Sequence, residues 1–126
     1  MRILIVDDSS MMRAMIKRVV LLTNVPVEEI LEARDGVEAL SLLSSHDVQL
    51  LFTDINMPGM NGAELLRQLA NDDRWRRLTR VVISTDGSTA RREEVAELSV
   101  RCYLKKPFSP EVLRDVLTDA AEAARL

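Results

Sequence analysis

The sequence predicts an α/β domain in which a five-stranded, doubly wound parallel sheet carries helices on both faces. Short apolar runs of strand length alternate with longer amphipathic segments along the 126-residue chain. Three of the runs are nearly continuous in Val, Ile and Leu, which is typical of parallel strands that are buried on both faces. Helical crossovers between parallel strands are almost always right-handed, so the five predicted helices divide between the two faces.

The predicted strands are the apolar runs at residues 3–6, 30–33, 50–53, 81–84 and 102–104. The first helix follows residue 8, where Ser9 or Ser10 can serve as its N-cap. Its apolar positions recur at three- and four-residue spacing. They are Met12, Met15, Ile16, Val19 and Val20. This pattern places Met12 and Met15 on the face that packs against the core.

The other helices carry start signals of their own. Asp35 and Asn61 each precede a Glu by three residues, a spacing that resembles a capping box and predicts a helix start. Residues 89–98 form a shorter predicted helix. For the last helix, Ser109 is a cap and Pro110 occupies the first helical position, where its missing N–H costs nothing.

Composition limits the function classes that remain. A chain of this length predicts one domain, residues 1–126, without an output domain. The net charge of −3 gives no general attraction to nucleic acid or anionic lipid. No apolar run exceeds four residues, which excludes a transmembrane helix. The single cysteine, Cys102, cannot form an internal disulfide, so a reducing cytoplasm is the expected location.

Arginines surround Trp75 in the segment before the fourth strand, at positions 74, 76, 77 and 80. A basic cluster with an aromatic residue can indicate nucleic-acid binding, but one aromatic is too few for a stacking platform. Asp72 and Asp73 also precede the cluster. We therefore interpret this segment as a solvated loop.

Charged and hydroxyl side chains stand where the predicted strands end. Asp7 and Asp8 follow the first strand, Asp54 the third, Ser84 and Thr85 the fourth, and Lys106 the fifth. Carboxyl ends of parallel strands meet at one edge of the sheet, which is where such folds collect their functional groups. Taken alone, Asp7 and Asp8 could simply cap a helix, and the hydroxyls could simply form a turn.

The combination is costly unless it binds something. Two carboxylates about 4 Å apart repel by roughly 4 kcal/mol at an effective dielectric near 20. A divalent cation would relieve that repulsion, and oxygen-only ligands favour Mg²⁺. A carboxylate beside such a cation can accept a phosphoryl group, with an ammonium and a hydroxyl for the remaining oxygens. Lys106 and Ser84 are of the right chemical type for these two roles.

Three segments together resemble the response-regulator receiver domain of two-component signalling. They are residues 3–9 (ILIVDDS), 53–62 (TDINMPGMNG) and 105–108 (KKPF). The central motif is highly specific, and all three lie in register over the whole chain. The resemblance implies a flavodoxin-like (βα)5 fold with strand order 2-1-3-4-5.

The resemblance also implies the residue roles. Asp54 is the phospho-acceptor, Asp8 a Mg²⁺ ligand, Asp7 a partner of metal-bound water, and Asn56 a metal ligand through its backbone carbonyl. The Lys106–Pro107 peptide bond is expected to be cis, and Gly59 and Gly62 shape the loop after Asp54 or are ordinary turn glycines. The implied switch residues are Ser84, with Thr85 as its alternative, and Tyr103, which could equally be a half-buried strand aromatic.

The function implied is a switch without enzymatic turnover beyond its own phosphorylation and dephosphorylation. Its expected partners are a sensor histidine kinase or phosphotransfer protein and a downstream target that binds the face of the fourth helix, fifth strand and fifth helix. Chemotaxis or motility control is the possible pathway. Residues 99–102 (SVRC) replace the small Gly-Ala turn usual in the family, and this can alter that face.

Four alternatives remain at this point. One is a phosphatase with an aspartyl-phosphate intermediate, although Asp7 and Asp8 are adjacent rather than spaced as Asp-x-Asp. The second is a phosphorelay intermediate. A flavin carrier of the same topology would need a hydroxyl-rich phosphate loop in place of the two acids. A degenerate receiver that acts without phosphate is disfavoured, because every residue that the phosphorylation chemistry needs is present.

Overall fold

The computed structural model describes residues 1–124. Within this part of the chain, strands and helices alternate as predicted. The elements are β1 (Arg2–Val6), α1 (Ser10–Leu22), β2 (Glu29–Ala33), α2 (Gly36–Ser45), β3 (Leu50–Thr53), α3 (Gly62–Ala70), the 3-10 turn η1 (Asp73–Trp75), β4 (Thr79–Ser84), α4 (Thr89–Val95), β5 (Cys102–Lys105) and α5 (Pro110–Ala124).

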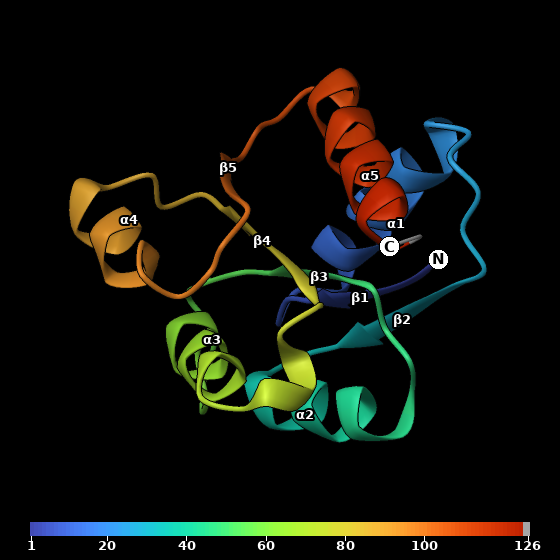
Figure 1. Cartoon of the computed structure of the whole chain (residues 1–126). Coiled ribbons are helices and arrows are strands. Elements are labelled where there is room, and N and C mark those ends of the chain that lie inside the picture. Colours follow the sequence, from blue (N-terminus) through green and yellow to red (C-terminus); the bar gives the residue numbers. More distant parts are fainter. Residues whose placement is uncertain (125–126) are drawn as a thin grey trace.

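The five strands form one parallel sheet in the order β2-β1-β3-β4-β5. Strands β2 and β5 therefore lie at the two edges, and β3 lies in the centre (Figure 1). The predicted fold class and strand order are confirmed. The chain turns back across β1 after β2, which places the carboxyl ends of β1 and β3 side by side at the point where the strand order reverses.

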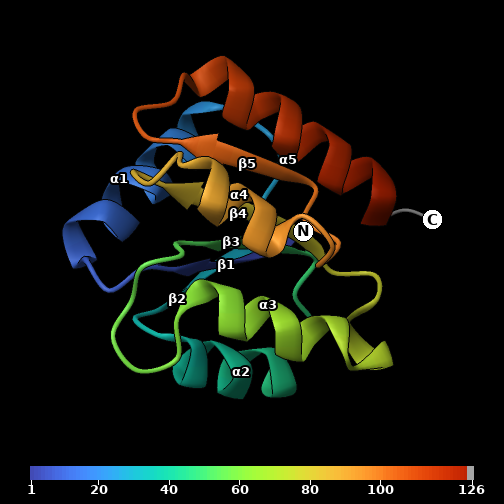
Figure 2. The same ribbon diagram turned by 90° about the vertical axis from the view of Figure 1, so that its left-hand side faces the viewer.

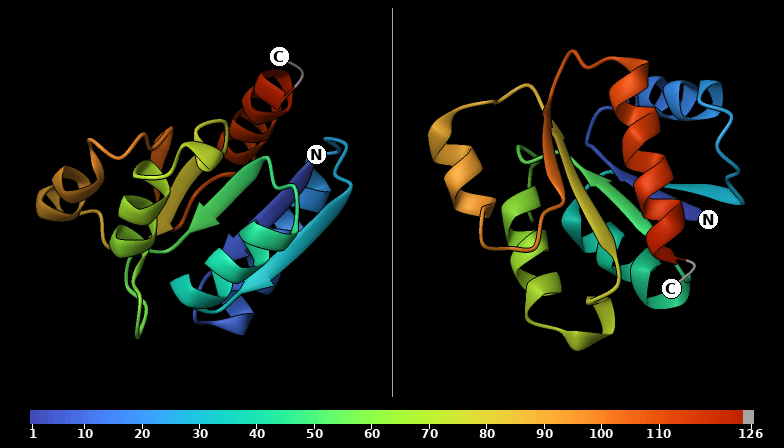
Figure 3. Two further views of the ribbon diagram at one scale, coloured as in Figure 1. Left: turned by 60° about the horizontal axis from the view of Figure 1, so that its bottom comes forward. Right: turned by 45° about the horizontal axis from the view of Figure 1, so that its top comes forward.

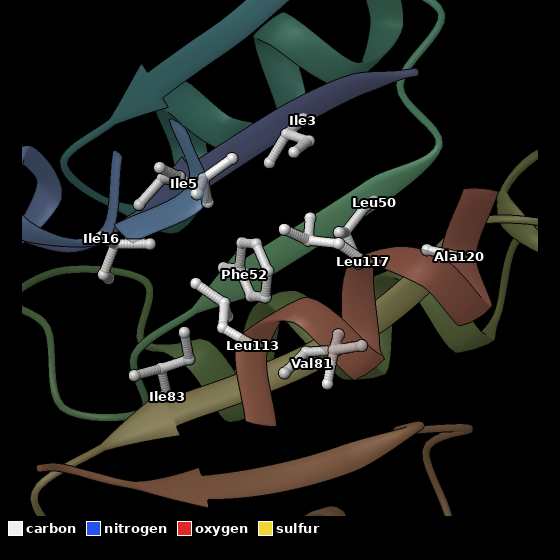
Figure 4. Close-up of a cluster of buried hydrophobic side chains, with 12 residues drawn as sticks. Ile3, Ile5, Ile16, Leu50, Phe52, Val81, Ile83, Leu113, Leu117 and Ala120 are labelled. Atoms are coloured by element: carbon white, nitrogen blue, oxygen red, sulfur yellow. The ribbon is translucent and has the colours of Figure 1, made fainter. Parts of the chain in front are cut away.

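Alternate residues of the central strands point to opposite faces of the sheet, where separate sets of helices cover them. Ile3 and Ile5 of β1 pack with α1 and α5, whereas Leu4 and Val6 pack with α2 and α3. Figure 2 shows these helices as two layers with the sheet between them. In Figure 4, α5 presents Leu113 and Leu117 to Phe52, which is almost completely buried.

Side-chain caps fix where the helices begin. Ser9 rather than Ser10 caps α1, and its hydroxyl accepts a hydrogen bond from the Met12 N–H. Asp35 and Asn61 cap α2 and α3 in the same way, as predicted from their spacing to the following Glu. Helix α4 ends at Val95, three residues earlier than predicted. Within residues 1–124, no helix is both long and apolar enough to cross a membrane.

Two predicted environments are wrong. Met15 is 43% exposed, because α1 turns only the stripe containing Ile16 and Val20 fully inward. Arg80 is buried inside β4 rather than solvated. Its guanidinium donates to the Trp75 carbonyl at 2.6 Å, and this hydrogen bond holds the turn before β4 against the strand. Burial lowers the pKa of Arg80 below its ordinary value.

The turn between α4 and β5 departs from ordinary backbone geometry at Ser99. This residue has φ 59°, in the left-handed region that a residue without Cβ adopts most easily. Ser99 is the first residue of the SVRC segment, where the resemblance to receiver domains implies a Gly-Ala turn. The turn therefore keeps a glycine-like conformation without a glycine.

Candidate functional site

The carboxyl ends of β1 and β3 bring three acids together. Val6 pairs with Thr53, so the residues that follow, Asp7 and Asp54, emerge beside each other. Each of Asp7, Asp8 and Asp54 offers a carboxylate oxygen, and these oxygens lie within 4.8 Å of one another. The three acids predicted from the strand ends therefore occupy one site.

Lys106 supplies the cation that faces these acids. Its Nζ lies 3.0 Å from Asp7 Oδ2 and 3.6 Å from Asp54 Oδ2. The Lys106 N–H donates to the Ser84 carbonyl at 2.8 Å, which ties the end of β5 to the end of β4. The Lys106–Pro107 peptide bond is cis, as the resemblance implies. Lys106 is thus within reach of both carboxylates, although 99 residues separate it from Asp7.

The three carboxylates have different surroundings. Asp7 is buried, and its Oδ1 accepts from the Ser9 N–H at 2.9 Å while its Oδ2 faces Lys106. Asp54 is partly exposed, and its Oδ1 accepts from the Ile55 N–H at 2.7 Å. Asp8 is exposed. Asp54 therefore keeps one oxygen tied to its own loop and the other directed at the ammonium.

The two candidate hydroxyls differ sharply. Ser84 is fully buried at the end of β4, whereas Thr85 is exposed. The Ser84 Oγ accepts from the Asp86 N–H at 3.1 Å, and the Tyr103 hydroxyl donates to the Asp86 carbonyl. Burial raises the pKa of Tyr103, while a hydrogen bond with Ser84 lowers it. Ser84 and Tyr103 therefore form one hydrogen-bonded group around Asp86, and Thr85 lies outside it.

The two glycines of the loop after Asp54 have separate reasons to be glycine. Gly59 has φ 70°, in the left-handed region. Gly62 begins α3, and a Cβ there would overlap the backbone carbonyl of Asp54 and lie 2.9 Å from Ile55 Cα. Its N–H donates to the Ile55 carbonyl at 2.9 Å. The start of α3 is therefore pressed directly against the residue whose carboxylate is the candidate acceptor.

The donor set fits a divalent cation. The acids contribute only oxygen ligands, and three carboxylates face one buried ammonium, so the site carries an excess of negative charge. Hard cations prefer such oxygen donors. Asp8 and Asp54 Oδ2, which among residues 1–124 makes no hydrogen bond shorter than its 3.6 Å approach to Lys106, offer the oxygens best able to bind such a cation, while Asp7 is already engaged by Lys106 and Ser9.

Two contacts at the site were missed by the sequence analysis. Arg13 Nη1 donates to the Asp7 carbonyl at 2.5 Å. Arg91 Nη2 donates to the Asn56 side-chain oxygen at 3.0 Å, although only the Asn56 backbone carbonyl was expected to matter. Arg91 lies 35 residues from Asn56, and no local pattern in the sequence links them.

A model of the response regulator receiver domain family matches residues 3–118. The chain belongs to this family. A chemotaxis protein CheY homolog from Campylobacter jejuni is 40% identical over 120 residues, covering 94% of this chain and 91% of the relative. The solved structure of Vibrio cholerae CheY4 superposes with a TM-score of 0.81 at 27% identity, covering 94% of this chain and 97% of that one.

A second solved receiver structure is the Mn²⁺-bound form of the response regulator Rcp1. It superposes with a TM-score of 0.77 at 25% identity, covering 94% of this chain and 89% of that one. This receiver domain is therefore a phosphorylation-activated response-regulator switch rather than a classical enzyme. Neither the fold nor these comparisons favour the phosphatase or phosphorelay alternatives.

Proposed function

We propose that Asp54 accepts a phosphoryl group from the phosphohistidine of a sensor kinase or phosphotransfer protein in a Mg²⁺-dependent reaction. The observation that carries the proposal is the position of the Asp54 carboxylate. Its Oδ2 lies 3.6 Å from Lys106 Nζ, within a group of three acids, and the side chain is 13% exposed. One carboxylate thus has a cation beside it and is reached from solvent.

Asp8, Asp54 and the Asn56 backbone carbonyl would hold Mg²⁺, with Asp7 bound through water. When bound, the ion would neutralise negative charge on the acids and on the phosphoryl oxygens. The response regulator Rcp1 has been solved in a Mn²⁺-bound form, which supports the proposal that this chain also binds a divalent metal. The oxygen-only donor set favours Mg²⁺ among the divalent cations of cells.

The transfer itself uses this chain's own groups. A carboxylate oxygen of Asp54 forms a bond to phosphorus, while the bond from phosphorus to the donor nitrogen breaks and its electron pair stays on the imidazole. The Lys106 ammonium, 3.6 Å from Asp54 Oδ2, would stabilise the charge that develops on the transferred oxygens, and the Ser84 hydroxyl would join it after moving from its present contact with Asp86. The same arrangement would support slow hydrolysis of the aspartyl phosphate.

Phosphorylation adds about −1.5 to −2 charge at the acceptor. We propose that Ser84 moves toward this charge and that Tyr103, linked to it around Asp86, changes position with it. The message then passes to a partner protein through the surface of α4, β5 and α5. The names of the relatives favour chemotaxis as the pathway. We propose that the protein acts in the cytoplasm.

The test is direct labelling. Acetyl phosphate and Mg²⁺ should add one phosphoryl group to the wild type, as measured by intact-protein mass spectrometry. Asp54→Asn should abolish the labelling, because the amide cannot act as the nucleophile. Asp47→Asn is the control, since Asp47 is an exposed acid in the α2–β3 loop, at the amino-terminal ends of the strands and away from the site. Labelling that persists in Asp54→Asn would refute the assignment, and continuous turnover of a phosphomonoester would support the phosphatase instead.

A further inference from the structure

Helix α4 is held to the rest of the molecule by little apolar contact. Val95 is the buried residue among its seven. In both views of Figure 3, α4 lies at the periphery, beyond the layers formed by the other helices. Because packing fixes α4 weakly, its polar contacts have a large share in deciding where it lies.

One of these polar contacts joins α4 to residues 54–61, the loop between β3 and α3 that begins with Asp54 and is called the acceptor loop below. Arg91 Nη2 donates to the Asn56 side-chain oxygen at 3.0 Å, and Asn56 is the second residue after Asp54. Arg91 Nε also lies 3.6 Å from an oxygen of Asp86, the second residue after Ser84. A single guanidinium thus touches the loops that follow both the acceptor and the buried hydroxyl.

The same guanidinium is tied to its own helix and, through it, to α3. Arg91 Nη1 donates to Glu94 at 2.8 Å, and the other Glu94 oxygen accepts from Arg67 of α3 at 3.0 Å. The hydrogen bond from Arg91 is the main reason that the pKa of Glu94 is lowered. The Arg91 guanidinium therefore contacts both the loops at the site and Glu94, the carboxylate that links α4 to α3.

We propose that Arg91 is a positioning residue that couples the acceptor loop to α4. The inference rests on the proposed phosphorylation of Asp54. A phosphoryl group there places new negative charge two residues from Asn56 and attracts the Arg91 guanidinium. Attraction in that direction weakens the Arg91–Glu94 pair, and α4 shifts relative to α3. Arg91 does not bond to Asp54 or Lys106, so phosphorylation itself does not require it.

The experiment compares amide hydrogen exchange in peptides that cover α4, with and without beryllofluoride and Mg²⁺. Beryllofluoride stands in for the phosphoryl group on Asp54. In the wild type, we expect α4 exchange to change on its addition. In Arg91→Ala this change should be at least threefold smaller, while acetyl phosphate still labels the variant. Arg77→Ala removes an exposed arginine just before β4, at the amino-terminal ends of the strands, and should respond as the wild type does.

A purely structural role for Arg91 would raise α4 exchange equally in both states and leave the difference unchanged, which would overturn the inference. Asn56→Ala removes the other end of the contact, keeps the backbone carbonyl and should reduce the response in the same way. The double variant should show no further reduction, because both substitutions remove one interaction. Asn56→Ala also provides the test if Arg91→Ala folds poorly.

The phosphorylation of Asp54 and the coupling through Arg91 can be refuted separately. If the wild type is not labelled by acetyl phosphate, the proposed function fails. If the wild type is labelled and Arg91→Ala keeps a full α4 response, or if α4 of the wild type does not respond, the coupling through Arg91 alone is refuted.

Discussion

Lys106 has a side chain that is only 7% exposed, and its amino group lies beside two carboxylates. An ammonium withdrawn from water costs several kcal/mol unless a counter-ion offsets the loss of hydration. Asp7 fills that role at 3.0 Å, and it is itself held by the Ser9 N–H. The pair fixes the ammonium in place, so its distance to Asp54 does not depend on a flexible side chain in solvent.

Tyr103 is the only tyrosine in the chain, so its ionisation reports on the hydrogen-bonded group that it forms with Ser84 around Asp86. Burial raises its pKa above the ordinary value of about 10. In a spectrophotometric titration we expect the folded protein to ionise at higher pH than the protein in guanidinium. The raised pKa contributes stability that is present below pH 10 and is lost as the pH rises through the folded value.

Ser84→Ala gives this prediction a directional check. The hydrogen bond with Ser84 lowers the pKa of Tyr103, so its removal should raise the midpoint further. Equal midpoints in the folded and denatured wild type would contradict the half-buried position of the ring. A lower midpoint in Ser84→Ala would contradict the expected effect of Ser84 on the pKa of Tyr103.

The residues at the strand ends could be predicted from sequence, because a parallel sheet brings the carboxyl ends of its strands to one edge whatever the details of packing. Asp7, Asp54 and Lys106 meet for that reason. The contact between Arg91 and Asn56 could not be predicted in this way. It depends on the tilt of a weakly packed helix and on which rotamer a long side chain adopts, and neither has a local signature.

Among the elements, α2 and α3 begin alike: each has an Asx cap followed by a glycine. Their glycines have different neighbours. A Cβ on Gly62 would meet the Asp54 backbone, whereas one on Gly36 would meet the flexible side chain of Met60. The same substitution at equivalent positions therefore has different consequences.

We expect Gly62→Ala to reduce the free energy of unfolding by about 1–3 kcal/mol, because the rigid loop must shift to admit the methyl group. Labelling by acetyl phosphate should fall as well, since the shift displaces Asp54. Gly36→Ala, the matched control, should change stability by less than about 1 kcal/mol and leave labelling intact. Denaturant unfolding and mass spectrometry measure the two effects. Equal losses in both variants would show that the Asp54 contact is not special.

Element boundaries were predicted less well than element types. Strand β4 begins at Thr79 and includes Arg80, whereas the apolar signal begins at residue 81. Backbone pairing with β3 places Arg80 opposite Leu51, so hydrogen bonding extends the strand beyond its hydrophobic part. A charged residue within a buried strand is an exception that a hydropathy pattern cannot indicate, because the carbonyls that accept from Arg80, those of Trp75 and Leu69, lie outside the strand.

On the scale of the whole molecule, three acids crowded around one ammonium oppose folding unless a cation binds. A ligand that binds only the folded state stabilises it by roughly 2.7 kcal/mol at a hundredfold excess over its Kd. We expect Mg²⁺ to raise the calorimetric Tm of the wild type and to have little effect on Asp8→Asn. NaCl at equal ionic strength is the control for screening, and the same rise with NaCl, or in Asp8→Asn, would contradict a specific site.

Trp75, the only tryptophan, lies before β4, at the end of the sheet where the strands begin. The acids lie at the end where the strands finish. The Trp75 side chain packs with the core cluster beneath α2 and α3. The Arg74 guanidinium covers its ring at 5.1 Å. We therefore expect its emission to report the integrity of the tertiary fold and to change little on phosphorylation of Asp54. One intrinsic fluorophore can thus report folding during kinase or metal titrations, and a signal that stays constant shows that the protein remained native throughout.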